Sequence, residues 1–244
     1  MNNSFFQAFN YYWSLSSLPA GSFDTSNITS VLWNYFFGEF NRYWALTSLP
    51  EGSFKIGGIT DPKTGFFRYF NRGWAITSLP VGSFDTSGIT GAVWEWFFAL
   101  FNANWALTSL PVGSFDISNI TSVRNHFFRA FNSNWALTSL PTGSFNTSNV
   151  TDVAWDYFFS YFNSNWALTS LPTGSFNISN ITGATRHHFF SYFNSNWALT
   201  SLPTGSFNTN NITNVGYYFF DQFNYNWALT SLPVGSFDIS NITG

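Results

Sequence analysis

Cysteine is absent from the 244 residues, which excludes disulfide bonds, thiolate metal sites and lipid attachment through a thiol. Charge is scarce as well: only 8% of the residues are charged, and the net charge is −3. That composition argues against a basic nucleic-acid-binding protein and against an acidic disordered chain. Polar residues interrupt every apolar run, so we expect no insertion into a membrane, and no secretory signal peptide is recognisable.

Aromatic residues are abundant instead, at 23% of the chain, with 32 Phe and 12 Trp. One tryptophan recurs every 30 or 31 residues, and a Phe-Phe pair and a Pro-x-Gly-Ser-Phe segment follow the same spacing. We number the repeats 1 to 8 by Trp13, Trp44, Trp74, Trp105, Trp135, Trp166, Trp197 and Trp227. The pattern predicts a single domain over residues 1–244, made of eight repeats without caps at its ends.

The repeat length predicts the fold class. A unit of about 30 residues cannot bury its apolar side chains alone, whereas stacked units can. We therefore predict a β-rich, repeat solenoid of eight coils of 30–31 residues, with a short helix in each coil. Phe36, Phe37 and Phe40 have the spacing of one helix face, and Asn41 is its expected end. Residues 45–49 are expected to form a short strand.

Two turns are expected after this strand. Pro50 and Gly52 fit a type I turn with proline second and glycine fourth. Further on, a corner position precedes a second short strand, Ile-Thr-x-Val, and holds only asparagine or glycine. We predict a left-handed φ at these corners, set by backbone shape rather than by the amide. The corner positions are Asn27, Gly58, Gly88, Asn119, Asn149, Asn180, Asn211 and Asn241, and each asparagine among them also matches the N-glycosylation pattern.

An alternation of aromatic and cationic residues stands three positions before the Phe-Phe pair in six successive repeats. If the repeats stack, these side chains form a cation–π ladder worth ~0.5–2 kcal/mol per contact. A chance alternation is the competing interpretation. The ladder positions are Trp33, Lys63, Trp94, Arg124, Trp155 and Arg186.

Catalysis is not indicated, and we predict no catalytic residue, no cofactor and no metal site. His126 and His188 directly precede a Phe-Phe pair, where other repeats carry Tyr35 or Trp96, so we expect them to fill a slot for a flat side chain. The pair His187-His188 could bind a metal, but no third ligand is patterned near it. Six of the eight repeats contain no histidine that could activate a serine or threonine.

The run LTSLPTGSFNTSNVTDVAWDYFF, residues 137–159, resembles the repeats of BspA-like, leucine-rich-repeat-related bacterial surface proteins. Those repeats share L-T-S-L, then a Phe, then D-T-S-N-V-T and a hydrophobic pair. The resemblance extends over all eight repeats and implies a leucine-rich-repeat-like solenoid on a cell surface, linked to adhesion and without enzymatic activity. This sequence departs from the pattern in its longer unit, in Phe-Phe for the usual Met-Phe, and in the tryptophan before the leucine.

The spacing across the two ends suggests self-assembly. Counting from Trp227 to Gly244 and on from Met1 of a second copy to its Trp13 gives 30 residues, a normal repeat spacing. We therefore expect head-to-tail stacking into an extracellular or cell-surface filament, with the protein itself as the partner. Two alternatives stay open: the chain is an excerpt of a longer array, or it is an adhesin that binds a glycan or a host surface protein through its solenoid face. Ice binding by the threonine array is a weaker reading, because threonine and serine alternate with leucines over a short strand.

Overall fold

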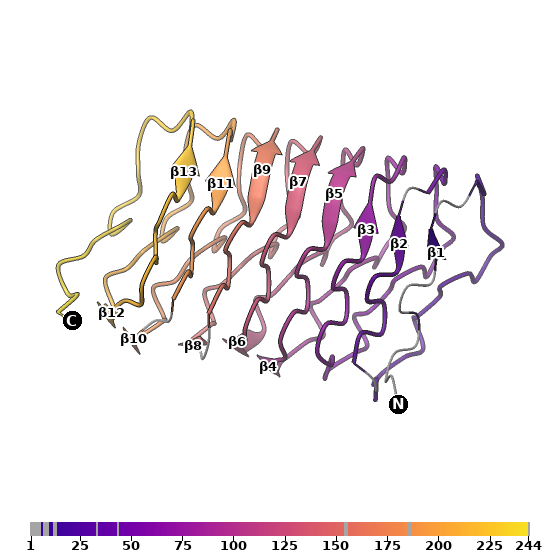
Figure 1. The fold of residues 1–244 in the computed structure, drawn as a ribbon, viewed down its shortest axis with the longest axis horizontal. Helices are drawn as coiled ribbons and strands as arrows, with labels where there is room; N and C mark the ends of the chain where they lie inside the picture. Colours follow the sequence, from indigo (N-terminus) through magenta and orange to yellow (C-terminus); the bar gives the residue numbers. More distant parts are fainter. Residues whose placement is uncertain are drawn as a thin grey trace.

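The computed structural model describes residues 6, 10–11, 14–32, 34–42, 44–153, 156–184 and 187–243. Regular structure in these residues consists of short strands, and no helix occurs among them. The aromatic pattern returns about every 30 residues, and each return of the chain lies beside the previous one (Figure 1). Sequence spacing therefore translates directly into position along the long axis of the molecule.

One parallel sheet takes a single strand from each repeat, and its strand order follows the sequence (Figure 1). Equivalent residues pair in register, as Asn102 with Asn132 and Trp105 with Trp135. The strands are two to four residues long, so the sheet is small, and it is open at both edges. Its members are β1 (Asn10–Tyr11), β2 (Asn41–Arg42), β3 (Asn71–Arg72), β5 (Asn102–Trp105), β7 (Asn132–Trp135), β9 (Asn163–Trp166), β11 (Asn194–Ser195) and β13 (Asn224–Tyr225).

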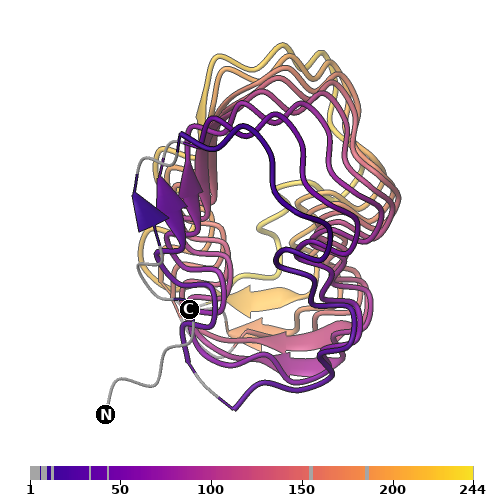
Figure 2. The ribbon, with the colours of Figure 1, turned by 90° about the vertical axis from the view of Figure 1, so that its right-hand side faces the viewer.

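Two smaller parallel sheets line another side of the cross-section (Figure 2). They consist of β4 (Gly91–Val93), β6 (Ile120–Val123) and β8 (Asp152–Val153), and of β10 (Gly183–Ala184) and β12 (Ile212–Asn214). The predicted Ile-Thr-x-Val strand forms over its full length only in β6. It is shorter in β4, β8, β10 and β12, and the described residues of repeats 1, 2 and 8 have no strand there. The strand predicted at residues 45–49 is wrong: the paired segment is the one just before it, β2, where consecutive residues bond to the neighbouring repeat.

The helix predicted around each Phe-Phe pair does not form. Tyr35 and Glu39 have positive φ values of 53° and 52°. The N–H groups of Tyr35, Phe37 and Glu39 donate to carbonyls of repeat 3, at 2.7–2.8 Å. A helix needs the same N–H groups for bonds to its own preceding turn, so hydrogen bonding between repeats replaces it. Asn41 accordingly begins β2 rather than ending a helix.

The turn after Pro50 also differs from the prediction. The N–H of Ser53 donates to the carbonyl of Pro50 at 3.2 Å, which makes proline the first residue of the turn and Gly52 the third. Gly52 has a φ of +82°, and the equivalent glycine has 79–87° in all eight repeats. A positive φ at the third position is the requirement of a type II turn rather than type I, and it explains why this position is always glycine.

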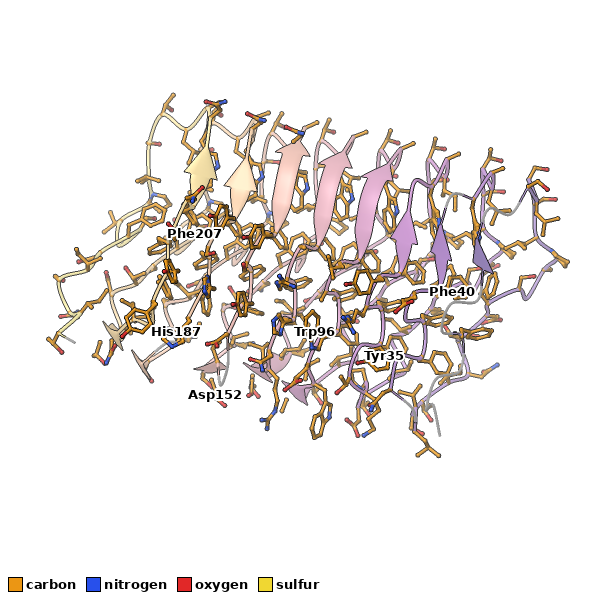
Figure 3. All side chains as sticks on the ribbon, in the orientation of Figure 1. Tyr35, Phe40, Trp96, Asp152, His187 and Phe207 are labelled. Atoms are coloured by element: carbon orange, nitrogen blue, oxygen red, sulfur yellow. The ribbon has the colours of Figure 1, made fainter. Side chains whose placement is uncertain are left out.

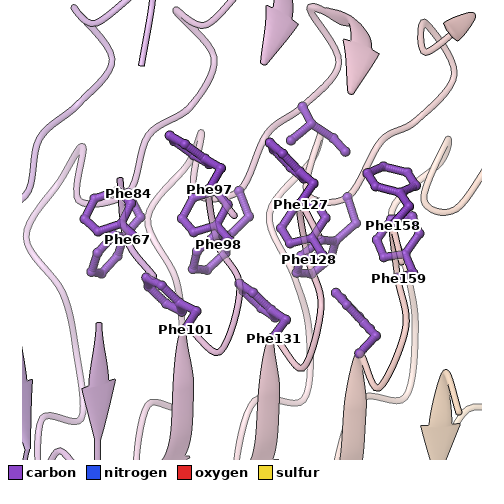
Figure 4. Packing of buried hydrophobic residues seen from close by; sticks show 14 of the residues in the cluster. Phe67, Phe84, Phe97, Phe98, Phe101, Phe127, Phe128, Phe131, Phe158 and Phe159 are labelled. Atoms are coloured by element: carbon purple, nitrogen blue, oxygen red, sulfur yellow. The ribbon is translucent and has the colours of Figure 1, made fainter. Parts of the chain in front are cut away.

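Phenylalanine and tryptophan fill the interior as columns that run from repeat to repeat, and Figure 4 shows the phenylalanine columns. Rings of successive repeats are nearly parallel, as for Phe98 and Phe128, whose centroids lie 5.5 Å apart with planes at 3°. Rings within one repeat meet edge to face, as for Phe98 and Phe101 at 5.2 Å and 89°. Both arrangements suit the ring quadrupole. The regularity breaks where Phe127 and Phe158 lie at 47°.

A serine ladder accompanies these columns. The hydroxyl of the serine in each Gly-Ser-Phe donates to the backbone carbonyl of the equivalent serine one repeat earlier, at 2.8–3.0 Å. The donors are Ser53, Ser83, Ser114, Ser144, Ser175, Ser206 and Ser236. Those from Ser53 to Ser206 are fully buried, so the bonds between two buried serines, from Ser83 to Ser206, satisfy carbonyls that water cannot reach.

Replacing Ser144 by alanine should lower the free energy of unfolding by about 1–3 kcal/mol, because the buried Ser114 carbonyl loses its donor. Chemical denaturation measures the change. Ser109→Ala is the matched control, since Ser109 is exposed and no hydrogen bond of its hydroxyl is found in the described residues. Equal stability of the two variants would contradict a structural role for the ladder.

Candidate functional site

The most distinctive side-chain cluster is a column of flat groups one position before the Phe-Phe pairs, which we call the outer column. In repeats 4 to 8 it consists of Trp96, His126, Tyr157, His188 and Tyr218. Successive ring centroids lie 3.8–4.8 Å apart, with planes within 16° of each other. The prediction that His126 and His188 fill this slot is confirmed.

An arginine completes the outer column where repeat 3 has no ring. Gly65 occupies the slot there, and the guanidinium carbon of Arg68 lies 5.8 Å from the centroid of the Tyr35 ring and 4.4 Å from that of Trp96. The planar guanidinium thus takes the place of the missing ring. Tyr35, Trp96 and, beside the column, His187 follow one another along the long axis (Figure 3). Most ring faces in the column are covered by their neighbours, which leaves mainly edges to a ligand.

His126 is the most perturbed titratable group of the column. Burial, reinforced by the positive charges of Arg129 and Arg68, lowers its pKa from 6.5 to about 4, against an opposing effect of Asp156. Its Nδ1 atom is buried and has no hydrogen-bond partner within the described residues. His126 is therefore a neutral ring at pH 7, as its position between Trp96 and Tyr157 suits.

Acidification should destabilise the protein through His126. The unfolded chain binds a proton near pH 6.5, whereas the folded chain resists it down to about pH 4. The stabilisation is therefore full above pH 6.5 and is lost as the pH falls toward 4. Thermal denaturation between pH 4 and 7 should show a smaller pH dependence for His126→Tyr than for the parent, because tyrosine fills this slot in repeats 2, 6 and 8. Identical pH profiles would refute the assignment.

The structure brings together only part of the predicted cation–π ladder. Trp33, Trp155 and Arg186 lie outside the described residues. The guanidinium carbon of Arg124 lies 5.6 Å from the Trp94 ring centroid. Lys63 forms an ion pair with Asp61, and the Trp94 indole N–H donates to the same carboxylate at 3.3 Å. The contact between Arg124 and Trp94 is therefore present as predicted, and the ladder as a whole stays a prediction.

A double-mutant cycle tests that rung. Trp94 is 46% exposed, so its coupling to Arg124 should be about 0.5–1 kcal/mol. Trp94→Leu should therefore cost less stability in an Arg124→Gln background than in the parent, when both are measured by chemical denaturation. Additive losses would mean that the two side chains do not interact.

The corner positions differ from their prediction in both respects. None of the eight has a positive φ. The side-chain amide donates to a backbone carbonyl of the preceding repeat, as Asn119 does to Ser87 at 2.8 Å and Asn149 to Ser118 at 2.6 Å. The amide is thus used, and it is the same nitrogen that a glycan would modify. Glycine is required at Gly88 for a steric reason, because a Cβ there would overlap the Gly57 carbonyl.

One position alternates between two residue types with a period of two repeats, which the 30-residue spacing alone does not predict. The position two residues after Gly-Ser-Phe holds threonine in odd repeats and isoleucine in even ones: Thr25, Ile56, Thr86, Ile117, Thr147, Ile178, Thr209 and Ile239. Each threonine hydroxyl donates to a carbonyl of the following repeat, as Thr86 does to Asp116 and Thr147 to Asn177, both at 2.5 Å. Each odd repeat therefore makes one bond to the following even repeat that the even repeats do not make in turn, in addition to the bonds that join all neighbouring repeats. The strict alternation was the signal available in the sequence.

Two further questions about the described residues are whether metal ligands cluster in them and whether a helix could span a bilayer. Nowhere in them do three or more His, Asp or Glu residues cluster closely enough to hold a metal ion. His187 stacks on Tyr217 and accepts a hydrogen bond from its backbone N–H at 2.7 Å, while His188 belongs to the outer column. The same residues contain no helix long and apolar enough to cross a bilayer.

Comparison with protein-family models, with curated proteins and with solved structures found no match to this chain. The resemblance to BspA-like repeats therefore stays a prediction that rests on the sequence motif alone.

Proposed function

We propose that the protein is a non-enzymatic structural repeat protein, a leucine-rich-repeat-like solenoid of eight coils that stacks head to tail into an extracellular or cell-surface filament. The resemblance to bacterial surface repeats supports the location. The in-register strands and the serine ladder support the solenoid, because each repeat offers the next one the same set of contacts. The uniform interior supports a mechanical rather than a chemical role.

One observation carries the proposal: repeat 8 exposes groups that the interior repeats bury, and a further repeat, whether of this chain or of a second copy, would cover them. Ile239 is 66% exposed, whereas Ile117 and Ile178 are 0% exposed. The same repeat carries an apolar hollow lined by Phe223, Trp227, Leu229, Leu232 and Phe237, among others. A second hollow, at repeats 1 and 2, is lined by Phe6, Phe23, Ile28, Val31 and Phe36, among others. Each hollow has the composition of an interface between repeats.

Polar groups on the two end surfaces are complementary in the same way. Inside the stack, the corner asparagine donates to a carbonyl of the preceding repeat. Asn27 is exposed, and a second copy stacked beneath it would present the Ser240 carbonyl to its amide. The isoleucine of repeat 8 would meet Thr25, which preserves the alternation of Ile117 and Thr147.

The two end surfaces differ from each other, so the contact is heterologous. Such a contact grows into a filament unless rotation between copies closes a ring. Low charge density keeps repulsion between copies small. At about 4.8 Å per repeat, one copy would add roughly 40 Å to the filament.

An adhesin that binds a glycan or a host surface protein is the second candidate. Its support is the exposure of two rings at one end, Tyr217 at 77% and Tyr218 at 59%. Along the rest of the outer column the ring faces cover one another, which leaves little room for a sugar to stack. The filament is therefore the better-supported function.

Ile239→Glu should abolish polymerisation, because the substitution places a charge at a position that the proposed contact between copies would bury. Negative-stain electron microscopy and light scattering over a dilution series of the parent should show filaments whose length grows with concentration. Thr182→Glu adds the same charge at an exposed position of repeat 6 and should leave filaments intact. Monomers of the parent at every concentration, together with measurable glycan or protein binding, would favour the adhesin.

A further inference from the structure

One surface of the molecule is almost free of charge, and we call it the neutral face. It comprises the segment of each repeat that runs from the residue after the tryptophan to the glycine of Pro-x-Gly-Ser-Phe. Glu51 is the only charged residue in these eight segments, although the whole chain has 8 basic and 11 acidic residues. The segments are 14–21, 45–52, 75–82, 106–113, 136–143, 167–174, 198–205 and 228–235.

These segments lie side by side along the stack (Figure 2). Backbone bonds join them, such as Thr108 N–H to the Thr77 carbonyl at 3.3 Å and Thr169 N–H to the Thr138 carbonyl at 3.1 Å. From repeat 2 to repeat 8 the Ala, Thr and Ser of Ala-(Leu/Ile)-Thr-Ser are exposed, which gives three parallel rows of small side chains. A fourth row, between proline and glycine, is mostly valine or threonine, and Val81 is 82% exposed.

Some hydroxyl groups of the neutral face already donate hydrogen bonds within the chain. The hydroxyls of Thr108, Thr169 and Thr230 donate to the backbone carbonyl of the threonine one repeat earlier, at 3.3–3.5 Å. Covering such hydroxyls costs less than covering free ones, because they keep a partner when water leaves. Small side chains also lose little conformational entropy when they are covered. Both properties suit a surface that is buried by association.

We propose that two copies of this chain pair side by side through their neutral faces, related by a two-fold axis that lies in the interface across the stack. The two stacks then run antiparallel, and repeat n of one copy lies opposite repeat 9 − n of the other. Rows meet like rows, and Glu51 in repeat 2 faces the neutral Thr204 in repeat 7.

A second copy fits this surface for two reasons. The rows of a second copy have the same spacing because the two chains are identical. A contact that forms at one repeat therefore forms at every repeat, as in the dry interfaces between stacked sheets. The face also has adequate size: roughly 40 Å by 20 Å gives about 800 Å² per partner, the area of a standard protein interface. Charged residues are depleted at the centre of protein interfaces, and they are equally scarce on this face. The proposal does not depend on head-to-tail stacking, since different surfaces are used.

The test isolates side-by-side pairing in an Ile239→Glu background, where end-to-end contact is blocked. Sedimentation velocity over a concentration series should show a monomer–dimer equilibrium. Adding Thr138→Lys and Thr169→Lys places positive charges from the two copies close together near the two-fold axis, and should raise the dimer dissociation constant at least about tenfold. Far-ultraviolet circular dichroism should confirm that all variants keep the parent spectrum.

Thr121→Lys is the matched control, because Thr121 is an exposed threonine of β6, outside the neutral face, and should leave the dissociation constant unchanged. A monomer at every concentration in the Ile239→Glu background would overturn the proposal, as would an equal effect of Thr121→Lys. Monomers that co-sediment with insoluble cellulose or chitin would also overturn it and assign the face to a polysaccharide. Filaments of the parent with a monomeric Ile239→Glu variant would leave head-to-tail stacking intact while rejecting the side-by-side pair.

Discussion

The fixed distance between successive repeats is the constraint on which the rest of this molecule depends. Parallel strands require about 4.8 Å between neighbours. Interior rings of successive repeats, such as Phe101 and Phe131 at 5.3 Å, stack across nearly the same distance with planes at 6°. One translation therefore serves both the backbone and the aromatic core. Each position must hold a side chain that packs against a copy of itself, which phenylalanine, tryptophan, serine and asparagine all do here.

Where self-pairing is unfavourable, the chain alternates. Two buried threonines in succession would leave a space that isoleucine fills, and Ile117 and Ile178 fill it at 0% exposure. The outer column holds a charged group once, where the guanidinium of Arg68 lies between the rings of Tyr35 and Trp96, whereas the alternation of threonine and isoleucine is regular. The chain thus has a period of two repeats in addition to the period of one. Odd and even repeats are therefore distinguishable, which they would not be in an array of identical units.

The surfaces divide the possible interactions of the protein. Repeats 1 and 8 carry apolar hollows. The outer column offers mainly ring edges, and the neutral face consists of small side chains with Glu51 as its single charge. End-to-end growth and side-by-side pairing would use separate surfaces. A substitution on one surface would therefore change filament length or filament thickness without changing the other.

The sequence by itself determined the period, the eight repeats, the interior position of Phe and Trp and the flat slot that holds His126 and His188, because these depend only on spacing and side-chain type. The tertiary structure decided the rest. It removed the helix, since the N–H groups of Tyr35 and Phe37 bond to the next repeat. It also moved the strand into β2 and gave the corner amides of Asn119 and Asn149 a partner one repeat away. In each case the deciding hydrogen bond joins residues about 30 positions apart, which no local propensity can reveal.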